Sequence, residues 1–170
     1  PALAISRDGR AIAFVASTAG VSRLYLRRRD DVEGHVIPGT QGASGPAFSP
    51  DGLWIAFASG TELKKTTLDG PPIVLAKVGD HRGITWLDND TIVFAPYAAQ
   101  NLFRIPASGG EPVAISKLEA SKGERTHRWP IVLPGGNAVL FTVGTYASPD
   151  SYETSRIDAV VIATGERRTV

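Results

Sequence analysis

Hydrophobic residues occur along this chain in short runs separated by turns rich in glycine, proline and aspartate, and no long run repeats with the helical period of about 3.6 residues. Four segments of similar pattern align on a final phenylalanine: 6–14, 49–57, 87–94 and 133–141. Those phenylalanines are 43, 37 and 47 residues apart, near the roughly 40–45 residues of a four-stranded propeller blade. We therefore predict a tandem repeat of blades in which Phe14, Phe57, Phe94 and Phe141 occupy one equivalent core position.

The pattern inside each unit predicts four short β-strands joined by turns. In the Ser-Pro-Asp-Gly turn at 49–52, proline presets φ, aspartate bonds nearby N–H groups and glycine accepts a positive φ. The fold class is accordingly all-β: one β-propeller domain over 1–170, with four blades of four antiparallel strands at about 1–41, 42–79, 80–122 and 123–170. The expected strands include 2–5 and 35–37; 46–48, 54–58, 63–68 and 73–75; 84–86, 91–95, 101–105 and 113–115; and 130–132, 138–143, 157–163 and 168–170.

Composition and charge narrow the classes of function. The 170 residues are 42% hydrophobic, and 18 basic residues stand against 17 acidic ones. A nucleic-acid binder normally carries a basic surplus, so we expect no nucleic-acid partner. No apolar run approaches the roughly 18 residues of a membrane span, and the absence of cysteine excludes disulfides, thiolate zinc sites and thiol nucleophiles.

The sequence offers no assembled catalytic chemistry. It lacks the Gly-x-Ser-x-Gly elbow of serine hydrolases. The histidines, His35, His81 and His127, have no second metal ligand close in sequence, and a site shared by His81 and His127 is less favoured than two histidines bonded to loop backbone. We expect no catalytic residues, no metal and no cofactor in this chain.

Loops at one end of the blades carry the residues best suited to recognition. In a propeller, the loop entering the first strand of a blade shares an end with the loop joining the second and third strands, and Tyr, Trp and Arg are enriched at binding hot spots. Repeat equivalence predicts a binding rim of Ser44, His81, Arg82, His127, Arg128 and Trp129, with Tyr97 and Tyr146 beside Pro96 and Tyr152 in neighbouring loops. In the structural alternative, Arg128 pairs with Glu124 or Asp88, and Trp129 caps the core beside Pro130.

Four blades fill only part of a ring if their geometry is that of a six- to eight-bladed propeller. Nothing polar replaces Ile12, Phe14, Val139 or Phe141, so we expect these residues to lie uncovered on the end blades. Three arrangements stay open: a segment of a longer propeller, two half-rings that self-associate through their end blades, and a closed four-bladed ring.

The motifs resemble the TolB family of β-propellers. The Ser-Pro-Asp-Gly turn followed by Ile-Ala-Phe, at 49–57 and more weakly at 6–14, is typical of its WD-repeat-like blades. The order of motifs over nearly the whole chain is similar to the propeller that follows the kinase and membrane segment of many bacterial serine/threonine protein kinases. Those motifs lie at 42–52, 63–72, 92–104, 108–113 and 127–130.

The resemblance implies a sensor or interaction module outside the cytoplasmic membrane, with a protein, a peptide or a small envelope-derived ligand as its partner. Three departures weaken the repeat: Arg7 replaces a turn proline, the third blade lacks one turn residue, and Gly135-Gly136 replaces Asp-Gly. The alternative function is the gating propeller of a prolyl-oligopeptidase-type hydrolase whose catalytic domain is absent from this chain.

Overall fold

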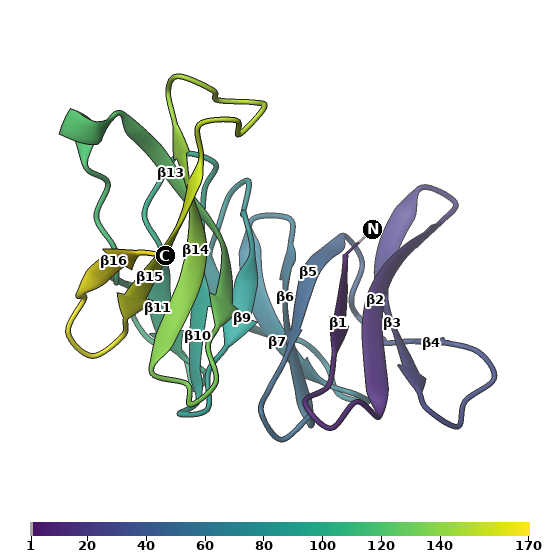
Figure 1. Cartoon of the computed structure of the whole chain (residues 1–170). Coiled ribbons are helices and arrows are strands. Elements are labelled where there is room, and N and C mark those ends of the chain that lie inside the picture. The colour runs from purple at the N-terminus through teal and green to yellow at the C-terminus, as the bar shows by residue number, and fades with distance from the viewer. Residues whose placement is uncertain (1) are drawn as a thin grey trace.

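The computed structural model describes residues 2–170 as four four-stranded antiparallel sheets, in each of which the strands follow one another in chain order. The sheets are fanned side by side in an open arc with the first and fourth blades at its two ends (Figure 1). This confirms the predicted all-β propeller architecture. No helix in the described range is long and apolar enough to cross a membrane.

The strand bounds define the four blades. The first contains β1 (Leu3–Ile5), β2 (Ala11–Thr18), β3 (Val21–Arg28) and β4 (His35–Val36). The second contains β5 (Ala43–Phe48), β6 (Trp54–Ser59), β7 (Glu62–Thr67) and β8 (Ile73–Lys77). The third contains β9 (Ile84–Trp86), β10 (Thr91–Phe94), β11 (Phe103–Pro106) and β12 (Val113–Ala114). After the short 3₁₀ helix η1 (Ala120–Lys122), the fourth contains β13 (Glu124–Val132), β14 (Ala138–Thr145), β15 (Arg156–Val161) and β16 (Arg167–Thr169).

Two first strands begin earlier than predicted. β5 starts at residue 43 rather than 46, and β13 starts at residue 124 rather than 130. Each continues past a proline through a bulge, with register shifts between Ser44 and Ala47 and between Arg128 and Ile131. A bulge tolerates a residue that cannot donate to the ladder, so proline does not mark the strand boundary here.

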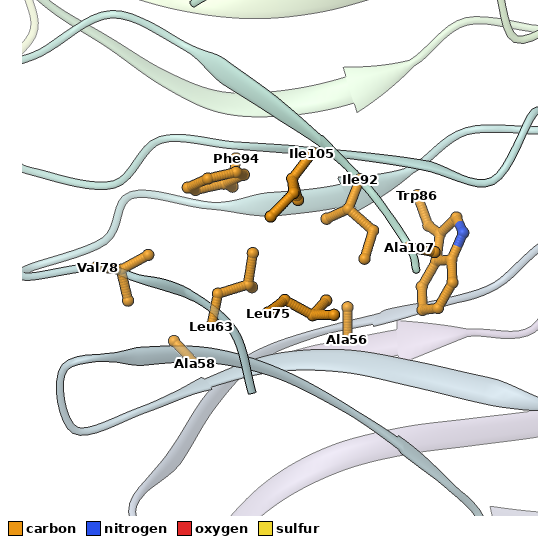
Figure 2. Packing of buried hydrophobic residues seen from close by; sticks show 10 residues of the cluster. All are labelled: Ala56, Ala58, Leu63, Leu75, Val78, Trp86, Ile92, Phe94, Ile105 and Ala107. Atoms are coloured by element: carbon orange, nitrogen blue, oxygen red, sulfur yellow. The ribbon is translucent and has the colours of Figure 1, made fainter. Parts of the chain in front are cut away.

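Hydrophobic layers between consecutive blades hold the arc together. Phe57, Phe94 and Phe141 are buried, and each packs against residues of the preceding blade, which confirms the predicted core position. Between the second and third blades, Phe94 faces Leu63 and Val78 (Figure 2). Burying one such side chain contributes about 1.5–3 kcal/mol.

The outer face of the first blade is uncovered, as expected. Phe14 and Ile12 are partly exposed, and Phe14 stacks on Tyr25 with ring centroids 5.5 Å apart. Leu3 and Ile5 pair with these residues and are 63% and 58% exposed. Each of the other blades packs this face against the blade before it, whereas in the first blade it is an exposed apolar surface.

The expectation for the fourth blade is wrong. Val139 and Phe141 are buried against the third blade rather than uncovered. Side chains alternate along a strand, so the outer face of this blade is formed by the intervening positions, including Leu140, Thr142 and Ile157.

The turns between first and second strands lie at the bottom of Figure 1, and we call them the lower turns (6–10, 49–53, 87–90 and 133–137). The turns of the first and second blades are closed by their own side chains. Ser49 Oγ donates to Asp51 and accepts the Trp54 N–H at 2.9 Å, and Asp51 accepts the N–H two residues on at 2.9 Å. Ser6 and Asp8 repeat this arrangement in the first blade. The serine hydroxyl is the main cause that lowers the pKa of each aspartate.

Candidate binding surface on the upper rim

The upper rim is the end of the arc opposite the lower turns, where β5, β9 and β13 begin or bend (Figure 1). Three blades have left-handed backbone at one repeat position: φ is 58° at Gly45, 112° at Gly83 and 51° at Trp129. The Trp129 N–H donates to the Arg82 carbonyl at 2.7 Å, which joins the fourth blade to the third. The repeat thus brings these inner positions to one surface.

Trp129 departs from this repeat, because it stands where the second and third blades have glycine. A residue with a Cβ in left-handed backbone costs roughly 1–2 kcal/mol. The Trp129 residue is 46% exposed, so the alternative that it caps the core is wrong. Residues held in strained backbone cluster at functional sites, so Trp129 is a candidate binding residue.

Arg128 is 7% exposed and lies beside Trp129. Its Nε donates to Thr126 Oγ1 at 3.0 Å, and its Nη2 donates to the Ala98 carbonyl at 2.6 Å. The alternative pairing with Glu124 or Asp88 is wrong, because those carboxylates bind other arginines. Burial is the main cause that lowers the pKa of Arg128.

Tyr152 completes an aromatic cluster with these two residues. Its ring centroid lies 5.1 Å from that of Trp129, and the Arg128 guanidinium carbon lies 5.2 Å from it. Its hydroxyl is the one buried side-chain polar atom in residues 2–170 without a hydrogen-bond partner. Tyr97, beside Gly79, and Tyr146 add exposed rings in the neighbouring loops.

Ser44, His81 and Arg82 form a second group on the rim. Ser44 Oγ lies 2.8 Å from His81 Nε2, and Arg82 forms an ion pair with Asp80. Burial is the main cause that lowers the pKa of His81. The second ring nitrogen, Nδ1, accepts the Gly83 N–H at 3.4 Å. The Ser44–His81 pair therefore has a backbone N–H where a Ser-His-acid triad has its orienting carboxylate.

His127 lies beneath the rim rather than on it. It is fully buried, so the prediction that it contributes to an accessible rim is wrong. Ser116 Oγ lies 2.7 Å from its Nδ1 and Glu124 Oε2 lies 3.3 Å from its Nε2. This resembles a Ser-His-acid relay, but a catalytic histidine must also protonate a leaving group. A ring with no exposed surface cannot reach one, so the relay is structural.

A buried ionic network surrounds this histidine. Arg156 and Arg167 both bind Glu124 and Asp158, whose side chains are almost completely buried. Burial would raise the pKa of Glu124, but hydrogen bonds from Arg167, the Glu119 N–H and Arg156 lower it to about 2. Burial, followed by the charge of Arg167, lowers the pKa of His127 to about 4.

Sequence reasoning missed this network, although a signal for it existed. Arg156 and Asp158 stand at alternate positions of β15, so they share one face of the strand. Arg167 of β16 lies on the same face, because its partner across the strands is Val160, two residues after Asp158. Charges at alternate positions of two paired strands predict a polar face. Across the described chain, no three His, Asp or Glu residues are grouped so that they could hold a metal ion.

An apolar groove of about 330 Å³ runs along the first strands of all four blades. Its lining includes Ile5, Pro46, Ile84 and Ile131. At its lower end, Arg7 of the first blade forms an ion pair with Asp88 of the third. The groove is therefore the inner side of the arc, and its polar chemistry is confined to its lower end.

No known family model matches this sequence, and no curated protein matches it. Solved structures do match. A protein described as putative TolB from Agrobacterium tumefaciens superimposes with a TM-score of 0.81 at 17% identity over 99% of this chain and 63% of its own. TolB from Acinetobacter baumannii gives 0.76 at 17% identity over 99% and 42%. The chain thus spans less than two thirds of either.

Enzymes share the same architecture. An oligogalacturonate lyase from Vibrio parahaemolyticus superimposes with a TM-score of 0.68 at 16% identity over 99% of this chain and 51% of its own. Structural matches at sequence identities this low establish the fold and not the function. The chain has a TolB-like β-propeller fold, and its function has to be argued from its own residues.

Proposed function

We propose that this TolB-like propeller is a non-catalytic module that binds a protein, a peptide or a small envelope-derived ligand through its upper rim. The observation that carries the proposal is the exposed side chain of Trp129. Its backbone has a positive φ, and the equivalent positions of the second and third blades are glycine. Arg128 and Tyr152 pack beside it. Tryptophan, tyrosine and arginine dominate binding hot spots.

Catalysis by this chain is disfavoured by the geometry of its two Ser–His contacts. His81 has a backbone N–H rather than a carboxylate at its second ring nitrogen, and His127 is sealed from any substrate. A nucleophile needs an adjacent base that is correctly oriented and accessible. We therefore propose that any catalysis in the parent protein resides outside this propeller.

We further propose that the module acts outside the cytoplasmic membrane as the sensor of a receptor-type serine/threonine kinase. The order of its sequence motifs supports this assignment. The flanking coding sequence tests it. Kinase motifs and a membrane span upstream would agree, whereas a Gly-x-Ser-x-Gly hydrolase downstream would overturn it in favour of a peptidase gate.

Peptide selection tests rim binding directly. A phage-displayed random peptide library is panned on the folded chain, and the selected peptides are titrated against Trp129→Gly and against Leu53→Ala. Leu53 is a matched control, because it is an exposed apolar residue in a lower turn. We expect Trp129→Gly to weaken binding at least about tenfold, as for a hot-spot residue, and Leu53→Ala to leave it unchanged. Equal binding by both variants would overturn the proposal.

The uncovered face of the first blade supports a proposal of self-association. The outer face of the fourth blade is repeat-equivalent to the faces that cover Phe57, Phe94 and Phe141. We propose that the outer face of another blade covers Phe14. In the isolated chain, that blade is the fourth blade of a second copy. Light scattering should then show a dimer. A stable monomer that binds no ANS would contradict it.

A further inference from the structure

Arg128 is the one buried arginine among the described residues, and it has no counter-ion there. Arg167 binds both Glu124 and Asp158, and even the more exposed Arg82 and Arg156 have carboxylate partners. Within residues 2–170, no carboxylate lies within ion-pair distance of Arg128. A buried charge is costly unless it is paired, so its partner is to be sought outside the chain.

One side of the Arg128 guanidinium is free to make that pairing. Nε and Nη2 are held by Thr126 and the Ala98 carbonyl, whereas Nη1 donates to no protein group in the described chain. Nη1 is also not among the unpartnered side-chain atoms that are sealed from solvent, so we place the ligand at this edge of the guanidinium. The two existing bonds fix the orientation of the fork before a ligand arrives, which lowers the entropic cost of binding.

The surroundings select the kind of anion. The rings of Trp129 and Tyr152 lie next to each other beside the guanidinium, with centroids 6.0 and 5.2 Å from its central carbon and 5.1 Å from one another. The two neighbouring arginines are engaged, Arg82 with Asp80 and Arg125 with a backbone carbonyl. The site therefore offers one free guanidinium edge beside a pair of aromatic rings, which suits a carboxylate better than a phosphate dianion.

We propose that Arg128 binds a carboxylate of the partner, an acidic side chain or a C-terminus, while apolar atoms next to that carboxylate pack on Trp129 and Tyr152. This inference rests on the proposed rim function and specifies its ligand chemistry: an acidic peptide with an adjacent hydrophobic group.

Titration followed by NMR of the arginine Nε–H and tryptophan indole N–H signals tests the proposal. The probes are N-acetyl-phenylalanine, its neutral amide and inorganic phosphate. We expect the carboxylate to bind saturably, with a Kd on the order of 1 mM for a ligand of this size, and to shift the signals of Arg128 and Trp129. The amide and phosphate should bind at least about tenfold more weakly.

Variants locate the site. Arg128→Gln should weaken carboxylate binding at least about tenfold, and Arg7→Gln, which alters an arginine at the lower end, should leave it unchanged. Should Arg128→Gln fail to fold, Arg128→Lys keeps the charge and should bind more weakly than the wild type, because lysine lacks the planar fork.

The results also separate this inference from the rim proposal. Equal affinity for the acid and the amide, tighter binding of phosphate, or full binding by a folded Arg128→Gln variant would each overturn the carboxylate site. Selected peptides that depend on Trp129 but not on Arg128 would overturn it while leaving rim binding in place. Peptides that depend on neither residue would overturn both.

Discussion

The two ends of the arc use their polar residues differently. In the lower turns, Ser49 and Asp51 bond to each other and to the backbone of the same turn. On the upper rim, Arg128 lacks a carboxylate partner, the Tyr152 hydroxyl lacks any partner, and Trp129 holds strained backbone. These lower turns satisfy their polar groups within the turn, whereas the upper rim holds one buried charge without a counter-ion and one buried hydroxyl without a hydrogen bond in the described chain.

The difference shows which sequence features carry structure and which carry specificity. The Ser-x-Asp-Gly turns recur along the chain and close themselves, so they set the blade geometry. Trp129 breaks the pattern at the position where the second and third blades have Gly45 and Gly83, whereas its neighbour Arg128 has a counterpart in Arg82. In a repeat protein, departures from the repeat on a rigid scaffold are the places to look for recognition.

The largest effect should come from the network that supports the rim. Glu124→Ala leaves Arg156 and Arg167 short of their shared carboxylate in a buried site. We expect the free energy of unfolding to fall by about 3–5 kcal/mol, measured by urea denaturation. The control is Glu33→Ala, at an exposed position, which should change it by less than about 0.5 kcal/mol. A small loss at Glu124 would mean that the network is dispensable.

Acid should destabilise the upper end first. The two histidines with lowered pKa values, His81 and His127, both lie there, whereas the unfolded chain takes up their protons near pH 6.5. The free energy of unfolding should therefore fall as the pH drops from 6.5 towards 4. The lowered pKa of Glu124 should cause a further loss as the pH drops from about 4.5 to about 2. Denaturation at several pH values measures this, and His127→Gln should flatten the first window. A constant stability between pH 6.5 and 4 would contradict the burial of these rings.

A smaller effect tests the close approach of the third and fourth blades. A Cβ at Gly83 would lie 2.9 Å from Trp129 Cα, whereas one at Gly9, in a lower turn, would meet nothing within 4 Å. Both glycines have positive φ. Gly83→Ala should therefore lower the free energy of unfolding by about 1–3 kcal/mol more than Gly9→Ala. Both substitutions strain the backbone, but only the one at Gly83 adds a steric clash with Trp129. Equal losses by urea denaturation would show that the rim backbone adapts freely.

The smallest effect is expected at Tyr152. Tyr152→Phe removes a hydroxyl that bonds to nothing in the described chain. The free energy of unfolding should change by less than about 0.5 kcal/mol or rise slightly, because no hydrogen bond is lost. A loss above about 1 kcal/mol would show that the hydroxyl serves the fold.

Sequence reasoning succeeded where the signal was local or periodic. The turn motifs and the spacing of the phenylalanines predicted the four blades and the core position that is buried in three of them, at Phe57, Phe94 and Phe141. It failed where geometry depends on strand register. The register shift beside Trp129, the burial of His127 and the ion pair between Glu124 and Arg167 are examples. Each depends on contacts between residues that are distant in the sequence, which no short motif reveals.

Hydrogen–deuterium exchange with a selected peptide tests the central claim most directly. Backbone exchange is compared for the free chain and for the chain saturated with peptide. We predict that protection is confined to the upper rim, at 79–83, 95–98, 125–129 and 146–153, and that the lower turns at 6–10 and 49–53 exchange as before. Protection of the lower turns, or of the apolar groove alone, would contradict the assignment of binding to the upper rim.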